Sequence, residues 1–213
     1  PVVSTNFHVN KNAHLVYMPF DNVNKLEPRA PLDEFHSPIG LLHNAYNWGF
    51  RGIMDEVIAR TGVRIFGSYG SPMGILTNDK VGDWLENALC FIHLKASDCP
   101  GYALYEAFAK AVPVVVTELF IDRMKYRDLY VAEETCLTWG QGSYEIKDGK
   151  IIEFMDESKE LMIEQICAVV ERLKNPEYNF YIGRNGYMKW RALTEWTDEK
   201  REAFREFLNE RGL

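Results

Sequence analysis

A chain of 213 residues with 46% hydrophobic and 26% charged residues can bury a sizeable core and has the composition of an ordinary globular protein. Its formal net charge of −7 disfavours nucleic acid as the main partner, because phosphate-backbone binding needs a basic face. No apolar run reaches the ~18–20 residues that a membrane-spanning helix needs. The four cysteines are dispersed and show no metal-binding spacing. We therefore expect a cytoplasmic protein with reduced thiols, no bound metal and no membrane span.

The first part of the chain lacks the pattern of a compact domain. Residues 1–13 are polar, His14–Met18 has the composition of a short strand, and residues 21–37 contain prolines without a helical period. We predict that residues 1–37 form a lead-in segment and linker. Residues 38–213 are predicted to form the folded domain.

After residue 37, short apolar runs alternate with amphipathic helical patterns, which is typical of a parallel sheet crossed by helices. The predicted strands are Pro38–His43, Val63–Phe66, Leu89–Leu94, Val114–Val116 and Thr135–Trp139. The predicted helices are Phe50–Thr61, Asp79–Ala88, Pro100–Ala111, Leu119–Val131, Ser158–Lys174, Tyr178–Leu193 and Thr197–Asn209. The sequence therefore predicts an α/β fold, a Rossmann-like parallel sheet with helices on both faces.

Three local features refine this prediction. Gly62 is expected to end the first long helix, and Thr197 to cap the last one. A small β-hairpin is predicted over Tyr144–Phe154, because the Asp148-Gly149 pair suits a two-residue turn. In the helix after the hairpin, an apolar stripe that includes Leu161 is expected to face inward.

The stretch from Ser97 to Ala107 combines the signals of a strand end, a polar turn and a helix start. Pro100 suits the first turn of a helix, where its missing N–H would have no partner. Asp98 and Glu106 flank this helix start. The stretch therefore places two carboxylates where a strand gives way to a helix.

In a parallel sheet, every loop from a strand to the following helix leaves the same edge, which is where open α/β sheets bind ligands. The loops expected to meet there are Asn44–Arg51, Gly67–Pro72, Lys95–Gly101 and Thr117–Ile121. Together they supply free backbone N–H groups, glycines and the cation of Arg51, which suit an anion such as a diphosphate. A carboxylate inside the helix, such as Glu106, could reach past the phosphates to a pair of hydroxyls.

These features resemble the C-terminal, donor-binding domain of the GT-B glycosyltransferases, in the retaining group with a Glu-x7-Glu motif. The resemblance covers roughly residues 38–208. The segments that carry it are Asp98–Glu106 with the following Pro113–Val116, Arg51-Gly52, Phe66–Gly70, Asp83–Ala88 and Ile182–Trp190.

The resemblance implies that the chain binds a nucleoside-diphosphate sugar and transfers its glycosyl group to an acceptor, which would be a glycan, a lipid or a protein. Glu106 would bind the ribose of the donor, and Asp98 would contact the transferred sugar. These two acids are therefore the predicted catalytic residues.

The same resemblance implies a set of donor-binding residues besides the two acids. Arg51 would bind phosphate, and the backbone amides of Gly101, Tyr102 and Ala103 would hold the diphosphate. Gly67 and Tyr69 would complete the donor pocket from the glycine-rich turn, with the Tyr69 ring stacked on the base or the sugar. The family needs no metal or other cofactor, because amides and cations stabilise the leaving diphosphate.

The family's N-terminal acceptor domain is absent from this sequence, so we expect a donor-binding half that transfers poorly alone. Two other functions stay open. Gly101–Glu106 after a buried strand also resembles the nucleoside deoxyribosyltransferases, in which a Glu is the nucleophile. A non-catalytic nucleotide-sugar-binding module is favoured by Asp98 in place of a Glu and by Tyr46 in place of an Arg.

Four of the polar residues also have structural interpretations. Glu106 could pair with Lys110 four residues later on an exposed helix face. Asp98 could simply cap its helix, and Arg51 could be a solvated surface cation. His93 lies inside an apolar run, which predicts a histidine satisfied within the core.

Overall fold

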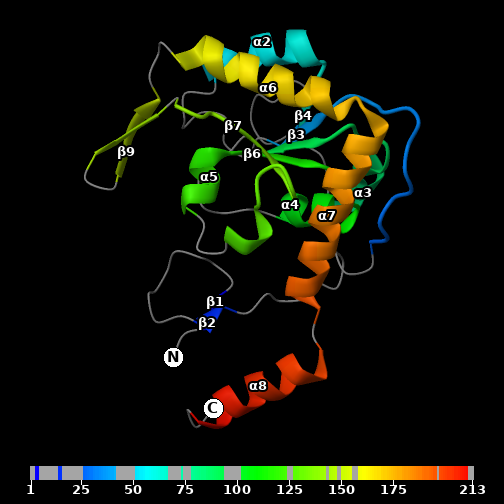
Figure 1. Cartoon of the computed structure of the whole chain (residues 1–213), viewed down its shortest axis with the longest axis vertical. Coiled ribbons are helices and arrows are strands. Elements are labelled where there is room, and N and C mark those ends of the chain that lie inside the picture. The colour runs from blue at the N-terminus through cyan, green and yellow to red at the C-terminus, as the bar shows by residue number, and fades with distance from the viewer. Residues whose placement is uncertain are drawn as a thin grey trace.

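A computed structural model describes residues 3–4, 14–15, 26–41, 51–66, 73, 78–93, 102–123, 127–142, 144–147, 150–154, 158–195 and 197–210 (Figure 1). The strands are β1 (Val3–Ser4), β2 (His14–Leu15), β3 (Ile39–Leu41), β4 (Arg64–Phe66), β5 (Phe91–His93), β6 (Val114–Thr117), β7 (Leu137–Trp139), β8 (Tyr144–Lys147) and β9 (Lys150–Phe154). The helices are α2 (Arg51–Thr61), α3 (Asn78–Glu86), α4 (Tyr102–Ala109), α5 (Glu118–Arg123), the 3-10 turn η1 (Arg127–Leu129), α6 (Lys159–Leu173), α7 (Pro176–Thr194) and α8 (Asp198–Asn209).

The main sheet has five parallel strands in the order β4-β3-β5-β6-β7. Its register pairs Leu41 with both Phe66 and His93, so the carboxyl ends of the first three strands lie at one edge. The chain passes from β3 to β4 on one side and then returns to β5 on the other. The strand order therefore reverses at β3, which makes the space between β3 and β5 the topological switch point of the sheet.

Helices cover both faces of this sheet, as the sequence predicts (Figure 1). One core cluster joins α2 and α6 to strand residues such as Ile65, Ile92 and Val115. The other joins α3, α4 and α7 to neighbours in the same strands, such as Phe91 and Val114. Successive residues of a strand point to opposite faces, so buried strands of this kind are apolar throughout.

Two glycines let α7 approach the sheet closely. A Cβ atom on Gly183 would lie 2.1 Å from the carbonyl oxygen of Ala111, and one on Gly186 would lie 2.9 Å from that of Thr135. Ala111 lies three residues before β6, and Thr135 lies two residues before β7. These contacts hold the middle of α7 against the amino-terminal edge of the sheet.

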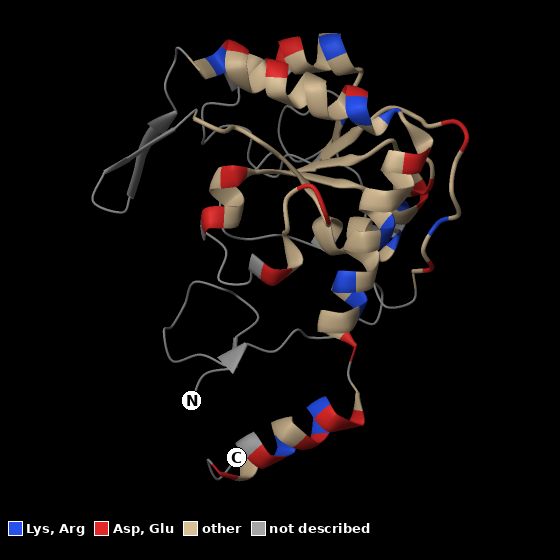
Figure 2. Cartoon of the chain, in the orientation of Figure 1, with Lys and Arg blue, Asp and Glu red and all other residues tan. Residues whose placement is uncertain are grey.

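The local predictions after residue 142 are largely confirmed. Strands β8 and β9 pair in antiparallel fashion as the expected hairpin, although its turn lies outside the described residues. The Thr197 hydroxyl caps α8 by accepting a hydrogen bond from the Lys200 amide at 3.2 Å. Acidic and basic residues alternate along α8 (Figure 2), and some of them form ion pairs at i,i+3 spacing.

Two predictions in the same half of the chain are wrong. Leu161 is 41% exposed, although the other apolar residues predicted to face inward from α6 are buried. It lies at the margin of the apolar stripe, where the neighbouring Met162 is buried instead. The single helix predicted over residues 119–131 is also replaced by the six-residue α5 and, after residues 124–126, by η1.

The segment before β3 is bound to the domain more tightly than a linker would be. Residues 26–37 contain no helix or strand, but Arg29 is only 8% exposed. The Arg29 amide donates to the Lys110 carbonyl at 3.1 Å, and the His36 amide donates to the Asn87 carbonyl at 2.7 Å. Earlier in the chain, β1 and β2 form a separate parallel pair.

Candidate functional site

Two helices begin at the carboxyl edge of the sheet, next to its switch point. Helix α2 begins at Arg51 after β3, and helix α4 begins at Tyr102 after β5. The two helices lie on opposite faces, because α2 belongs to one core cluster and α4 to the other. The first N–H groups of each helix have no partner within the helix, and the two helices follow β3 and β5, the strands on either side of the switch point. This is the position at which open α/β sheets bind ligands.

Half of the predicted site residues lie on these two helices. Arg51 is the first residue of α2, and Tyr102, Ala103 and Glu106 lie in the first turns of α4. The side chains of Arg51 and Tyr102 are outside the described part of the chain. The remaining predicted residues fall entirely outside the described residues, and they are Gly67, Tyr69, Asp98 and Gly101.

Glu106 is half-buried, and this burial raises the pKa of its carboxyl group. The alternative interpretation, in which Glu106 pairs with Lys110, does not hold, because the Lys110 ammonium binds the Glu86 carboxylate on α3. Within the described ranges, no side chain hydrogen-bonds or ion-pairs with Glu106. Its carboxylate is therefore partly desolvated and has no compensating partner among the described side chains, a state that costs free energy.

Packing fixes the helix that carries Glu106. Leu104 and Phe108 are buried on the sheet side of α4, and the Phe108 ring meets Tyr130 edge-on at 5.8 Å between centroids. Ala103, Glu106 and Lys110 follow one another at i, i+3 and i+7, so they share the half-buried face of the helix. Glu106 thus projects from a rigid element rather than from a loop.

The end of β5 is built from buried aromatic side chains. His93 is 2% exposed, and its ring lies 4.4 Å from that of Phe120. The prediction that His93 belongs to the core is therefore confirmed. The Thr117 hydroxyl accepts a hydrogen bond of 2.9 Å from the Phe120 amide, which caps α5 where it leaves β6.

Cysteines and acids show no sign of a metal centre in the described ranges. Cys90 and Cys136 are buried in the core, and burial raises the pKa of each thiol to about 12. Among the described residues, no group of His, Cys, Asp and Glu side chains could hold a metal ion. None of the helices in these same ranges combines the length and the apolar character needed to cross a membrane.

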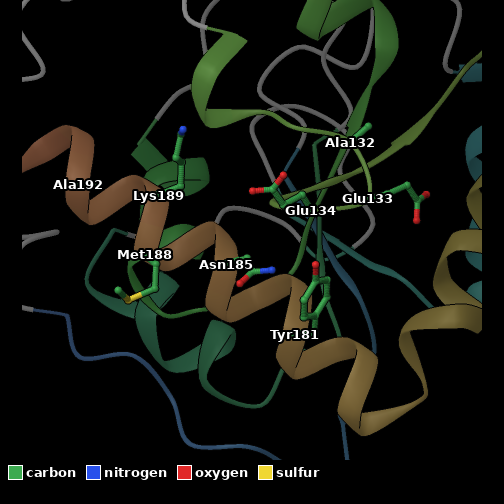
Figure 3. Close-up of a pocket in the computed structure, with 8 residues that line it drawn as sticks. All are labelled: Ala132, Glu133, Glu134, Tyr181, Asn185, Met188, Lys189 and Ala192. Atoms are coloured by element: carbon green, nitrogen blue, oxygen red, sulfur yellow. The ribbon is translucent and has the colours of Figure 1, made fainter.

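Sequence reasoning missed a pocket on the far side of α7. The turn at residues 131–135 and the outer face of α7 line an open surface pocket of about 610 Å³, and Figure 3 shows its lining side chains. The residues around it are Ala132, Glu133, Glu134, Tyr181, Asn185, Met188, Lys189 and Ala192. A sequence signal for this pocket is the spacing of Tyr181, Asn185 and Met188, which places polar and apolar side chains on one helix face.

Comparison with known proteins identifies the fold. No family model matches the sequence, and no curated protein matches it. Sucrose-phosphate synthase from Thermosynechococcus elongatus superimposes with a TM-score of 0.63 at 13% identity, over 99% of this chain and 58% of that protein. The C-terminal domain of a glycosyl transferase group 1 family protein from Francisella tularensis gives 0.54 at 10% identity, over 82% of this chain and 98% of that domain.

A third similar structure is that of S. aureus TarM, solved as a point mutant in complex with fondaparinux, alpha-GlcNAc-glycerol and UDP. It matches 98% of this chain with a TM-score of 0.59 at 13% identity. The chain spans only 42% of TarM, so it corresponds to less than half of that protein. At such low identity the likeness defines the fold, which is the Rossmann-like α/β fold of the GT-B glycosyltransferases.

Proposed function

We propose that this chain is the nucleotide-sugar-binding half of a metal-independent cytoplasmic glycosyltransferase of the hexosyltransferase type. It would hold a nucleoside-diphosphate sugar at the carboxyl edge of the sheet, for transfer of the glycosyl group to a glycan, lipid or protein acceptor. The fold supports this proposal, because its structural neighbours include glycosyltransferases and one of them was solved with UDP.

The observation that carries the proposal is the environment of Glu106. Its half-buried carboxylate has a raised pKa and no partner among the described side chains. An ionised carboxylate accepts two hydrogen bonds without offering a competing donor, so it suits the paired hydroxyls of a ribose. The hydroxyl groups of a bound ligand would supply hydrogen bonds in place of those to water that this carboxylate has lost on folding.

The diphosphate would lie between the starts of α2 and α4. The first backbone amides of α4, at Tyr102 and Ala103, are free of helical hydrogen bonds and favour a negative charge. Arg51, at the first position of α2, would add a cation. In this proposal Gly101 allows the close approach of the phosphates, and Gly67 and Tyr69 close the pocket from the turn after β4.

Catalysis would depend on the stabilisation of the leaving diphosphate. As the glycosidic bond breaks, negative charge grows on the diphosphate, and fixed amides with a nearby Arg51 stabilise that charge without a metal. Asp98 would contact the transferred sugar, and its x7 spacing from Glu106 follows the retaining group. Since the chain spans 42% of TarM, we expect donor binding without efficient transfer.

Thermal unfolding with four nucleotide sugars tests the proposal. We expect one of UDP-, GDP-, ADP- or dTDP-glucose to raise the melting temperature, because a ligand that binds the folded state stabilises it. The rise should be smaller in Glu106→Gln and unchanged in Glu164→Gln, which changes an exposed carboxylate on α6. An unaltered melting temperature with all four donors, or an unaltered rise in Glu106→Gln, would overturn the proposal.

A further inference from the structure

The pocket beside α7 lies at the edge of the sheet opposite to the candidate donor site. Its turn, residues 131–135, precedes β7, and the neighbouring Gly183 packs against Ala111 just before β6. The start of α4, in contrast, follows the carboxyl end of β5. A molecule in the α7 pocket would therefore occupy a site separate from the donor edge.

Both walls of this pocket are held in place before any ligand binds. The Val131 carbonyl accepts hydrogen bonds from the amides of Glu134 at 3.1 Å and Thr135 at 2.9 Å. The Thr135 hydroxyl accepts from the Val131 amide at 2.8 Å. Because Gly186 of α7 packs directly on the Thr135 carbonyl, the turn and the helix cannot separate freely. A preformed site loses little entropy when it binds.

Glu133 is already engaged, which fixes the turn from its other side. Its carboxylate accepts a hydrogen bond of 3.0 Å from Arg172 and one of 2.8 Å from the Tyr178 hydroxyl. These bonds hold the pKa of Glu133 below its usual range. In Figure 3 the Glu133 side chain points away from the other labelled side chains. Its charge is therefore compensated by Arg172 rather than offered to a ligand.

The side chains that remain around the pocket are chemically mixed. Figure 3 shows the Tyr181 hydroxyl directed toward the turn that carries Glu134, and the Asn185 side chain beside it on the same helix. Tyr181 is 51% exposed and Met188 56% exposed, so an aromatic ring and a thioether are presented to solvent. Within the described part of the chain, the side chains of Tyr181, Asn185 and Glu134 make no hydrogen bond with other residues.

The charges and shapes of these groups select the class of ligand. Glu134 and Lys189 carry opposite charges, so the pocket favours neither an anion nor a cation. A carboxylate and an amide bind hydroxyl groups, while an exposed ring covers the apolar C–H face of a sugar. A volume of about 610 Å³ is within the range of small-molecule sites. From these features we infer that the α7 pocket binds a neutral oligosaccharide.

This glycan site is independent of the donor edge, so its failure and that of the proposed function are distinguishable. It would hold a carbohydrate chain at the far side of the domain, where no transfer takes place. A glycan bound there would keep the domain close to a polymeric carbohydrate. The probes are therefore free oligosaccharides without a nucleotide.

Titration with maltotetraose, cellotetraose and chitotriose, followed by backbone NMR shifts of the whole chain, tests the inference. We expect at least one of them to shift resonances of residues 131–135 and 181–192 at millimolar concentration. Tyr181→Ala and Glu134→Gln should each weaken that binding about tenfold. Both residues are exposed, so neither change should unfold the domain.

A control variant and a test for dimerisation show whether the oligosaccharide binds at the α7 pocket. Glu164→Gln removes an exposed carboxylate on α6 and should bind the same oligosaccharide as the parent chain does. Sedimentation of the parent chain reports whether the α7 face instead joins two copies. The inference is overturned if none of the probes shifts these resonances, if Tyr181→Ala binds unchanged, or if Tyr181→Ala only dissociates a dimer.

Discussion

The Arg29 guanidinium donates a buried hydrogen bond of 2.9 Å to the side-chain oxygen of Asn179, which stands 150 positions later in the chain. Arg29 also donates to the carbonyl of Ala88. The Asn179 amide in turn donates to the carbonyls of Leu89 at 2.8 Å and Leu173 at 3.0 Å. One network thus joins the segment before β3, the start of β5, the end of α6 and the start of α7.

Replacement of Asn179 by leucine should destabilise the protein strongly. Burial already lowers the pKa of Arg29 to about 10, and Asn179→Leu would remove an acceptor from this desolvated cation. We expect the free energy of unfolding to fall by about 3–5 kcal/mol, because the buried cation and the carbonyls of Leu89 and Leu173 each lose a hydrogen-bond partner. Urea unfolding of the variant measures the change.

A double variant separates the charge effect from the loss of packing. In Arg29→Met with Asn179→Leu, the buried cation is gone, so the combined loss should be smaller than the sum of the two single losses. Strict additivity would mean that the two side chains do not depend on each other. A change within about 0.5 kcal/mol for Asn179→Leu alone would also contradict the prediction.

The same network predicts that residues 26–37 contribute to the stability of the domain. Leu26 and Phe35 pack against the two core clusters, in addition to the buried Arg29. A chain that begins at residue 38 should therefore be less stable than one that begins at residue 26, by about 2–4 kcal/mol of lost apolar burial. Equal melting temperatures for the two chains would support a domain boundary at residue 38 instead.

Local patterns predicted the sheet and its helices because the signals lie within the elements themselves. Apolar runs gave the strands, and the 3.6-residue period gave α6 and α7. Gly62, with a φ of +67°, ends α2 where the sequence predicts its stop. Leu161 was misplaced because periodicity gives the centre of an apolar stripe more reliably than its margin.

Tertiary partners could not be predicted in this way. A lysine four residues after Glu106 suggested a pair on one helix, but the long Lys110 side chain reaches Glu86 on the adjacent α3. The burial of Arg29 depends on Asn179, and no local pattern relates the two. At the candidate site, the apolar run Leu89–Leu94 and Pro100 indicated a strand-to-helix edge, whereas the half-buried state of Glu106 came only from the structure.

The affinity for a nucleotide sugar should depend on pH through Glu106. Only the ionised carboxylate accepts two hydroxyl hydrogen bonds, and burial places its pKa above the ordinary value of 4.5. Affinity should therefore fall as the pH is lowered from neutral through the raised pKa of Glu106, at a higher pH than an exposed glutamate would require. Calorimetric titration should show this loss of affinity in the parent chain. Glu106→Gln should bind the nucleotide sugar about 1–3 kcal/mol more weakly at neutral pH, and its affinity should not change with pH in this way.

The contribution of Glu106 to the stability of the unliganded protein should change with pH in the opposite direction to the ligand affinity. Because the folded-state pKa of Glu106 is raised, the folded chain binds its proton more tightly than the unfolded chain does. The contribution of this group to stability is present at low pH and is lost as the pH rises through the folded pKa. Relative to Glu106→Gln, the parent chain should gain stability toward pH 4.5. Parallel pH profiles of the two melting temperatures would refute this assignment.

Alanine at two helical glycines should change stability in opposite directions. Alanine normally stabilises a helix interior by about 0.5–1 kcal/mol relative to glycine. In α3, a Cβ on Gly82 would meet Leu26 at 3.7 Å, an ordinary contact, so Gly82→Ala should show this gain.

In α7, a Cβ on Gly183 would lie 2.1 Å from the Ala111 carbonyl oxygen and 3.3 Å from Pro113. The backbone cannot move aside without shifting β6, so Gly183→Ala should lose about 3 kcal/mol or more. Thermal unfolding of both variants measures the contrast, and a stabilised Gly183→Ala would show that α7 does not touch the sheet edge in solution.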